Sequence, residues 1–82
     1  MKTASAENIV AIVAAIAARP AAQLSPATDL YADLKLDSLG ALELMVALED
    51  EFGIDIGTDE AKDIRTIGDI VGLVQRLMRA RD

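Results

Sequence analysis

Apolar residues recur with the period of an α-helix in three long segments of this 82-residue chain. In residues 5–18 they fall at i, i+3, i+4 and i+7, which places on one helical face Ile9, Ile12, Val13 and Ile16. Arg19-Pro20 should end this helix, because proline restricts the residue before it and lacks the N–H that the next turn needs. The pattern therefore predicts a first helix over residues 5–18.

Residues 38–52 carry two different helical stripes. Leu44, Leu48 and Phe52 recur at every fourth position and should face the core, with Ala41 and Met45 beside them. A second stripe mixes apolar and acidic residues and should face water: Leu39, Glu43, Val46 and Asp50. Gly53 follows, and glycine accepts the left-handed conformation in which helices often end. These residues predict the second helix.

The C-terminal third predicts a short helix and a long one. Thr58 is a candidate N-cap for a helix over residues 58–63, with Ile56, Ala61 and Ile64 available for packing. Thr66 should cap the last helix, because acidic Asp69 then lies in the first turn and three arginines lie in the last turns, as the helix dipole favours: Arg76, Arg79 and Arg81. Its buried stripe is expected to be Ile67, Ile70, Val71, Val74, Leu77 and Met78.

A long connection occupies residues 21–35. A structureless loop of this length is uncommon in a compact domain, so we expect its large apolar side chains to pack on the helices, with one helical turn near residues 29–34: Leu24, Leu30, Tyr31 and Leu34. The fold class is all-α. The chain should form a four-helix bundle of three longer antiparallel helices and a short third one, in a single domain over residues 1–82.

The composition supports helices and excludes several kinds of chemistry. Apolar residues make up 52% of the chain, but its only aromatic residues are Tyr31 and Phe52, which disfavours a β-sheet. Cysteine and histidine are absent, so Ser-His and Cys-His nucleophile pairs, disulfides and imidazole-bound zinc are excluded. These absences exclude self-contained nucleophilic catalysis by the chain, in keeping with a non-catalytic protein. The lack of disulfides is compatible with the cytoplasm, which we take as the expected location.

The net charge of −6 argues against a nucleic-acid partner, because phosphates would repel the chain. Eleven of the fourteen acidic residues lie between Asp29 and Asp63. They are either solvated helix faces or a docking surface for basic enzymes, centred on the second helix. Their spacing does not match the Asp-x-Asp-x-Asp-Gly pattern of a calcium loop, so no specific metal site is expected.

The N-terminal segment has a second interpretation. Lys2 followed by the apolar run from Ile9 to Ala18 loosely resembles a secretory signal. Glu7 and Asn8 interrupt that pattern, and removal of the segment would remove one of the three helical faces. We favour the helix. The run is also too short to span a bilayer, so no membrane span is expected.

Ser38 stands at the predicted start of the second helix and has two interpretations. As an N-cap, its side-chain oxygen would accept a hydrogen bond from a free amide of the first turn. As a modified residue, it would place an attached phosphate beside those amides and the positive end of the helix dipole. The two interpretations are compatible, because the same geometry serves both.

Several short segments carry a resemblance that covers nearly the whole chain: Asp33-Leu34, Asp37-Ser38-Leu39, Glu43-Leu44, Leu48-Glu49-Asp50-Glu51-Phe52-Gly53 and Thr66-Ile67-Gly68-Asp69-Ile70. At these spacings the sequence resembles the acyl carrier protein family. The resemblance implies that Ser38 carries a 4'-phosphopantetheine arm, which a phosphopantetheinyl transferase takes from coenzyme A. The thiol of that arm would hold acyl groups as thioesters for fatty-acid or related polyketide and specialised lipid biosynthesis.

The same resemblance implies two sets of site residues. The first matches positions that meet partner enzymes: Asp37, Leu39, Glu43, Val46, Glu49, Asp50 and Ile56. The expected partners are acyl-loading enzymes, ketosynthases and acyltransferases with basic surfaces, which should take turns on a monomer. The second set matches an acyl pocket between the helices: Leu48, Ile56, Ala61, Ile64 and Ile70. We expect this pocket to be small, because Ile70 is bulkier than the alanine often found there.

Three residues depart from the family pattern. Lys35 and Leu36 stand where glycine and a small residue are common, and Gly40 replaces a small polar or acidic residue. These departures leave open whether the chain is a housekeeping carrier or a specialised one. An aminoacyl or peptidyl carrier would share the fold and the serine, and an unmodified helical interaction module would use the same stripes. These two alternatives also remain open.

Overall fold

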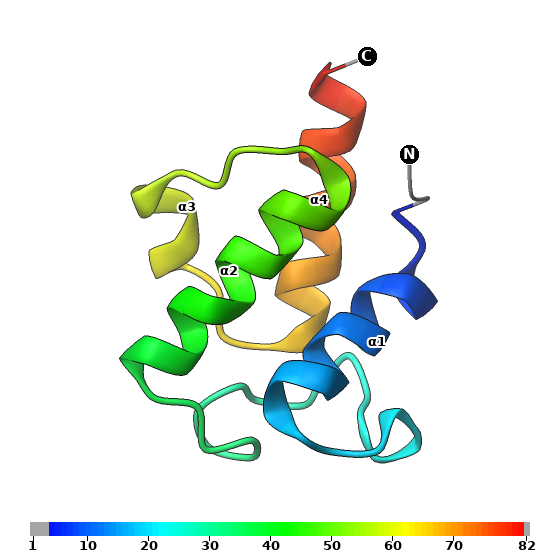
Figure 1. Cartoon of the computed structure of the whole chain (residues 1–82), viewed down its shortest axis with the longest axis vertical. Helices are drawn as coiled ribbons and strands as arrows, with labels where there is room; N and C mark the ends of the chain where they lie inside the picture. Colours follow the sequence, from blue (N-terminus) through cyan, green and yellow to red (C-terminus); the bar gives the residue numbers. More distant parts are fainter. Residues whose placement is uncertain (1–3, 82) are drawn as a thin grey trace.

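The computed structural model describes residues 4–81, which fold into a bundle of helices (Figure 1). The helices are α1 (Ala6–Ala17), α2 (Ser38–Phe52), α3 (Thr58–Lys62) and α4 (Ile67–Arg81), with a short 3₁₀ helix η1 (Ala21–Gln23) after α1. Figure 1 shows that α1 runs antiparallel to α2 and to α4, while the short α3 returns the chain to the start of α4. The predicted all-α, four-helix class is confirmed; η1 was not predicted.

The ends of α1 are set by one residue on each side of the helix. Ser5 is the N-cap, and its hydroxyl accepts a hydrogen bond from the N–H of Asn8 at 3.1 Å. Ala18 ends the helix in the left-handed conformation with φ 56°, and the Arg19 N–H bonds back to the Ala14 carbonyl at 3.0 Å. The helix therefore ends at Ala17, with Ala18 as its C-cap, before Pro20 is reached.

The core lies between α1, α2 and α4. The largest fully buried side chains come from all three helices and from the long connection: Phe52, Ile9, Leu30, Leu44, Leu48, Ile67, Ile70, Val13 and Val74. The predicted core stripe of α2 is confirmed. On α4 half of the predicted stripe is buried, since Val71, Leu77 and Met78 are half-buried, and the buried Leu73 was not predicted. On α1 only part of the predicted stripe is buried, since Ile12 and Ile16 remain half-buried.

The long connection is hydrogen-bonded to the start of α4. The N–H of Leu30 bonds the Arg65 carbonyl at 2.9 Å, and the N–H of Ile67 bonds the Thr28 carbonyl at 3.1 Å. A third bond joins the Gly68 N–H to the Pro26 carbonyl at 2.9 Å. A Cβ at position 68 would lie 3.1 Å from that carbonyl oxygen, so glycine permits the close approach. We call these three hydrogen bonds the loop–α4 stitch.

The connection also contains the expected helical turn. The N–H of Asp33 and of Leu34 both bond the carbonyl of Asp29, at 3.0 and 3.1 Å. Leu30 and Leu34 are buried as predicted. Tyr31, however, was expected to pack on the bundle and is 41% exposed.

The caps of the last two helices differ in how well they were predicted. Gly57, not Thr58, is the N-cap of α3, because its N–H donates to Glu60 Oε1 at 3.1 Å and Thr58 is already helical. Thr66 caps α4 as expected: its Oγ1 accepts the Asp69 N–H at 3.1 Å, and Asp69 Oδ2 accepts the Thr66 N–H at 3.0 Å. No described helix has the length and apolar character needed to cross a membrane.

Candidate functional site

Asp37 and Ser38 form the junction between the long connection and α2. Asp37 has extended backbone angles, and its Oδ1 accepts the N–H of Gly40 at 2.7 Å. Asp37 is therefore the N-cap and Ser38 is the first helical residue. The interpretation of Ser38 as the cap is wrong, because the preceding carboxylate already accepts the amide hydrogen bond that a serine cap would take.

The Ser38 hydroxyl is consequently free to react. Ser38 is exposed, and within residues 4–81 its hydroxyl makes no hydrogen bond. It lies at the positive end of a 15-residue helix, where unpaired amides of the first turn favour an anion. An exposed alcohol in this position suits attachment of a phosphodiester, so the residues present fit a phosphopantetheine group.

The other serines of the chain are both engaged. Ser5 caps α1 through its hydroxyl, and Ser25 Oγ lies 3.3 Å from Thr28 Oγ1 within a loop turn. The chain has only these two serines besides Ser38. Ser38 is thus distinguished from them by its exposure, its free hydroxyl and its place at a helix start.

Lys35 precedes this junction in an unusual backbone conformation. Its φ of 59° lies in the left-handed region, which glycine tolerates far better than lysine does. Lys35 stands where glycine is common in the family pattern. The structure therefore gives a physical reason for that pattern, and this chain carries strain in its place.

The mixed stripe of α2 faces solvent as predicted. Leu39 and Val46 are 63% and 46% exposed, and Glu43 and Asp50 are also exposed. Leu42, at 60%, is equally exposed but was missed. Its spacing of three residues from Leu39 and four from Val46 would have placed it on the same face. We call Leu39, Leu42, Glu43, Val46 and Asp50 together the α2 surface.

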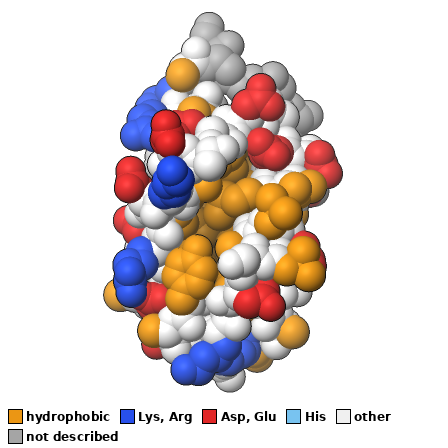
Figure 2. Space-filling view, turned by 90° about the vertical axis from the view of Figure 1, so that its left-hand side faces the viewer, with side chains coloured by type: hydrophobic (Ala, Val, Ile, Leu, Met, Phe, Trp, Pro, Cys, Tyr) orange, Lys and Arg blue, Asp and Glu red, His pale blue; other side chains and the backbone are white. Residues whose placement is uncertain are grey.

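Figure 2 shows the side of the molecule on which α3 and the start of α2 lie. Apolar side chains gather in the middle of this face. Acidic side chains lie mainly above and to the right of them in this view, while basic side chains lie along the left edge, next to further acidic ones, and at the bottom. The face thus combines apolar contact area with a rim of mixed charge.

Three residues of the predicted partner-binding set also have a structural role. Glu49 is half-buried, and its Oε2 accepts the N–H of Ile56 at 2.8 Å, which holds the connection between α2 and α3. Ile56 in turn packs against the core. Asp37, the cap of α2, is a third such case. Substitution of these residues would alter the fold as well as any contact with a partner.

The predicted acyl-pocket residues are closely packed. Leu48 and Ile70 are fully buried, Ile64 is buried, and Ile56 and Ala61 are half-buried. Among four surface hollows of the described part of the chain, these five residues line only one, through Ile64. A core pocket at these residues stays a prediction, and it would require their side chains to separate.

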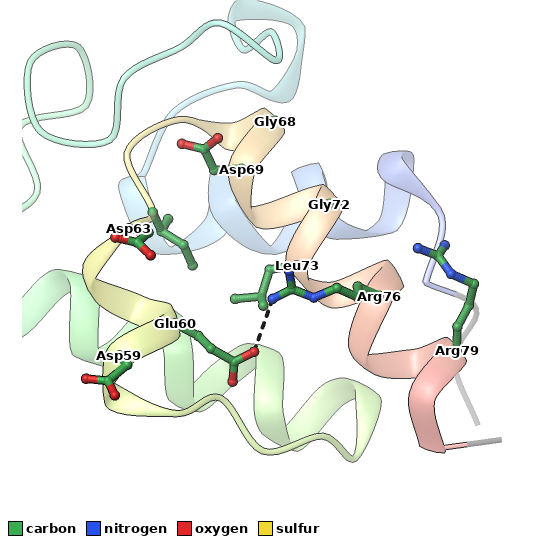
Figure 3. A pocket seen from close by; sticks show the side chains of 10 residues that line it. Asp59, Glu60, Asp63, Gly68, Asp69, Gly72, Leu73, Arg76 and Arg79 are labelled. Carbon is green, nitrogen blue, oxygen red and sulfur yellow. Dashed lines mark hydrogen bonds and ion pairs between the residues drawn. The ribbon is translucent and has the colours of Figure 1, made fainter.

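The hollow that Ile64 lines lies between α3 and α4 and has a volume of about 570 Å³ (Figure 3). Its walls are largely charged: Asp59, Glu60, Asp63, Asp69, Arg76 and Arg79. Arg76 Nη2 donates to Glu60 Oε2 at 3.1 Å across the hollow. Such walls do not suit an apolar chain. Among the described residues no group of three potential ligands could hold a metal ion.

An exposed serine at a helix start, presented by a small acidic helical bundle, is the arrangement expected of a carrier domain that bears a phosphopantetheine arm. The family model described as "Phosphopantetheine attachment site" matches residues 7–74. An acyl carrier protein from Thermobifida fusca (strain YX) is 36% identical over 70 residues, which cover 85% of this chain and 89% of that protein. The chain belongs to the acyl carrier protein family.

Two solved structures agree. A candidate acyl carrier protein from Mycobacterium tuberculosis is 34% identical with a TM-score of 0.79, covering 87% of this chain and 95% of that one. The acyl carrier protein from Enterococcus faecalis is 30% identical with a TM-score of 0.72, covering 89% and 98%. The predicted carrier function in fatty-acid or related biosynthesis and the phosphopantetheine cofactor are confirmed. The aminoacyl carrier and the unmodified module are set aside.

Proposed function

We propose that Ser38 is the residue that carries the phosphopantetheine arm. The observation that supports this is the exposed Ser38 hydroxyl, which Asp37 frees from the capping role. In the transfer, Ser38 Oγ forms a bond to the β-phosphorus of coenzyme A. The pyrophosphate P–O bond breaks, adenosine 3',5'-bisphosphate leaves, and the serine proton passes to the transferase.

Intact-mass measurement tests the attachment site. The apo protein is incubated with coenzyme A and a phosphopantetheinyl transferase of broad specificity. We expect wild type to gain one phosphopantetheine unit and Ser38→Ala to gain none. Ser25→Ala is the matched control, because it removes a loop serine while leaving the α2 junction intact, and it should gain one unit. Equal gain by Ser38→Ala would show that another residue is modified.

The α2 surface is the proposed site for partner enzymes, together with Asp37, Glu49 and Ile56 at its edges. Its exposed leucines and valine supply contact area, while its carboxylates orient basic partners and accelerate their encounter. The partners would be the phosphopantetheinyl transferase, acyl-loading enzymes, ketosynthases and acyltransferases. The absence of histidine and cysteine supports a carrier that these enzymes act upon. We expect it to work as a cytoplasmic monomer, one domain over residues 1–82.

A further inference from the structure

Lys35 is the one cation in an otherwise acidic stretch of the chain. Residues 20–61 contain ten acidic residues and no other lysine or arginine. Lys35 stands three residues before Ser38, so this single positive charge is close in sequence to the proposed attachment residue. The charge is exceptional for its surroundings, and its position beside Ser38 suggests a task there.

The Lys35 side chain has no ionic partner in the fold. It is exposed, and within residues 4–81 it forms no ion pair or hydrogen bond. Its two acidic neighbours in sequence bind backbone amides instead. Asp33 Oδ2 accepts a backbone N–H at 2.8 Å, and Asp37 Oδ1 accepts the N–H of Gly40 at 2.7 Å. The Lys35 ammonium group is therefore available to an anion that is attached to the chain later.

The backbone at Lys35 is strained, because its φ of 59° lies in the left-handed region. The lysine side chain forms no bond with residues 4–81 that would compensate for this strain. Strained residues persist most often at functional sites, where the strain serves a task other than stability. A lysine that strains the apo protein while its charge is unused in the fold fits that description.

The segment from Lys35 to Ser38 leaves both side chains exposed at the start of α2. Leu36 packs against the core, and its N–H bonds the Leu30 carbonyl at 3.1 Å, which anchors the segment. Lys35, Asp37 and Ser38 are exposed. Three residues of chain span at most about 11 Å, so the Cα atoms of Lys35 and Ser38 lie no further apart than this. The flexible four-carbon stem of lysine can reach across such a gap to a group on Ser38 Oγ.

The group that the proposed function attaches at Ser38 begins with a phosphodiester, which is negatively charged at neutral pH. The neighbouring Asp37 carboxylate repels this charge, and Asp37 has already taken the Gly40 N–H. The start of α2 therefore offers the phosphate fewer free amides than an uncapped helix would. A lysine ammonium binds phosphate as a compact point charge, which would offset the repulsion by Asp37.

We propose that Lys35 binds the phosphate of the arm on Ser38 and positions the first segment of the arm at the start of α2. Lys35 is a positioning residue, because it holds the phosphate and takes no part in the chemistry at the thiol. This inference rests on the proposed attachment at Ser38. The contact is ionic and lies on the surface, so it forms part of the time at low salt and weakens as salt screens it.

Nuclear magnetic resonance of the protein with its arm attached tests the contact. The chain has only three lysines, so ¹³C labelling of the lysine ε-carbons gives three signals. We expect nuclear Overhauser contacts from the Lys35 ε-methylene protons to the methylene of the arm that adjoins the phosphate. Lys62, on α3, should show none. Sodium chloride at about 1 M should remove most of the Lys35 intensity. Absence of the Lys35 contact at low salt overturns the proposal.

Three variants separate the charge of Lys35 from its backbone. Lys35→Gln keeps the Cβ and the left-handed backbone but removes the charge, whereas Lys35→Arg keeps all three. The order of the arm is measured by the heteronuclear Overhauser effect of its labelled amide nearest the phosphate. This value should fall in Lys35→Gln toward that of a freely flexible arm, and it should be retained in Lys35→Arg and Lys62→Gln. Equal values in wild type and Lys35→Gln overturn the proposal, since a purely structural role of Lys35 would leave the arm unaltered.

Intact mass separates this inference from the proposed attachment. Wild type and the three variants should each gain one arm from coenzyme A. If wild type gains none, or if Ser38→Ala also gains one, attachment at Ser38 is wrong and the role of Lys35 falls with it. If the arm is on Ser38 and the Lys35 contact is missing, the attachment stands and the role of Lys35 alone is overturned.

Discussion

Asp37 and Ser38 divide two tasks that the sequence pattern assigned to Ser38 alone. Serine and aspartate are about equally good N-caps, so two adjacent candidates leave the start of a helix uncertain by one residue. The backbone angles decide the matter: Asp37 is extended and Ser38 is helical. The proposal of Ser38 as the attachment residue follows from its neighbours in sequence, but the reason why its hydroxyl is free does not.

This division of tasks predicts different stabilities for two alanine variants of the apo protein. Asp37→Ala should lower the free energy of unfolding by about 1 kcal/mol, because the Gly40 N–H loses its acceptor. Ser38→Ala should change it by less than about 0.5 kcal/mol, since no hydrogen bond is lost. Urea denaturation followed by circular dichroism measures both. A larger loss for Ser38→Ala would mean that the serine is the cap after all.

Lys35 predicts a gain in stability. Lys35 has a left-handed backbone conformation, which costs a residue with a Cβ about 1–2 kcal/mol. Glycine adopts this conformation without that cost, but it loses more conformational entropy on folding because the unfolded chain is more flexible. Lys35→Gly should therefore raise the free energy of unfolding by up to about 1 kcal/mol. Lys35→Ala removes the same charge and keeps the Cβ, so it should gain much less. Equal gains in both variants would trace the effect to charge.

At the scale of the elements, the sequence predicted the helices far better than the connections. The bounds of α2 follow from Gly53, which has φ 63°, and from strict four-residue spacing of its core leucines. The exposure of Tyr31 and the short helix η1 depend on tertiary geometry that periodicity does not contain. Helix α3 is short and has no buried residue, so it has no apolar periodicity that could fix its first residue. The sequence therefore could not distinguish Gly57 from Thr58 as the N-cap.

Two carboxylates that accept backbone hydrogen bonds, Asp29 in the long connection and Asp69 at the start of α4, predict that the free energy of unfolding depends on pH. Hydrogen bonds from the Thr66 and Arg65 amides lower the pKa of Asp69, and bonds from the Ala32 and Tyr31 amides, with the Arg65 charge, lower the pKa of Asp29. A pKa lowered by folding gives stability that is present above the unfolded value of about 4 and is lost as pH falls through the folded value.

The measurement compares wild type with Asp69→Asn in urea at neutral pH and near pH 3, below the ordinary pKa of aspartate. Wild type should be the more stable protein at neutral pH, and the difference should shrink in acid. Asp55→Asn is the control for general charge effects, because its exposed carboxylate makes no hydrogen bond within residues 4–81. A difference for Asp69→Asn that does not vary with pH would contradict the assignment.

At the scale of the whole molecule, the net charge of −6 concerns association more than folding. Sequence alone indicated that the acidic residues cluster around the second helix. The sequence did not show which of these carboxylates are engaged in hydrogen bonds within the fold. In the structure, backbone amides donate hydrogen bonds to five of them: Asp29, Asp37, Glu49, Glu60 and Asp69. Glu43 and Asp50 are exposed on the α2 surface, where no described amide engages them.

Reversal of one such charge should slow the encounter with a basic partner. Glu43→Lys is expected to lower kcat/KM of the phosphopantetheinyl transferase by roughly three- to tenfold at low salt, with a smaller effect at high salt. Glu7→Lys makes the same change of charge on α1 and should have little effect. If both variants lose activity equally, net charge and not the α2 surface governs the encounter.

The loop–α4 stitch joins residues 35 to 42 positions apart in the sequence, and all of α2 and α3 lies between them. Closing so long a loop costs conformational entropy, which is compensated only when the non-local contacts have formed. The helices within the loop, in contrast, form from local contacts. The stitch should therefore form after the folding transition state. The Asp29–Arg65 side-chain pair lies beside the stitch, with Arg65 Nε 3.3 Å from Asp29 Oδ2. Removal of this pair should accelerate unfolding in stopped-flow experiments and leave the folding rate nearly unchanged.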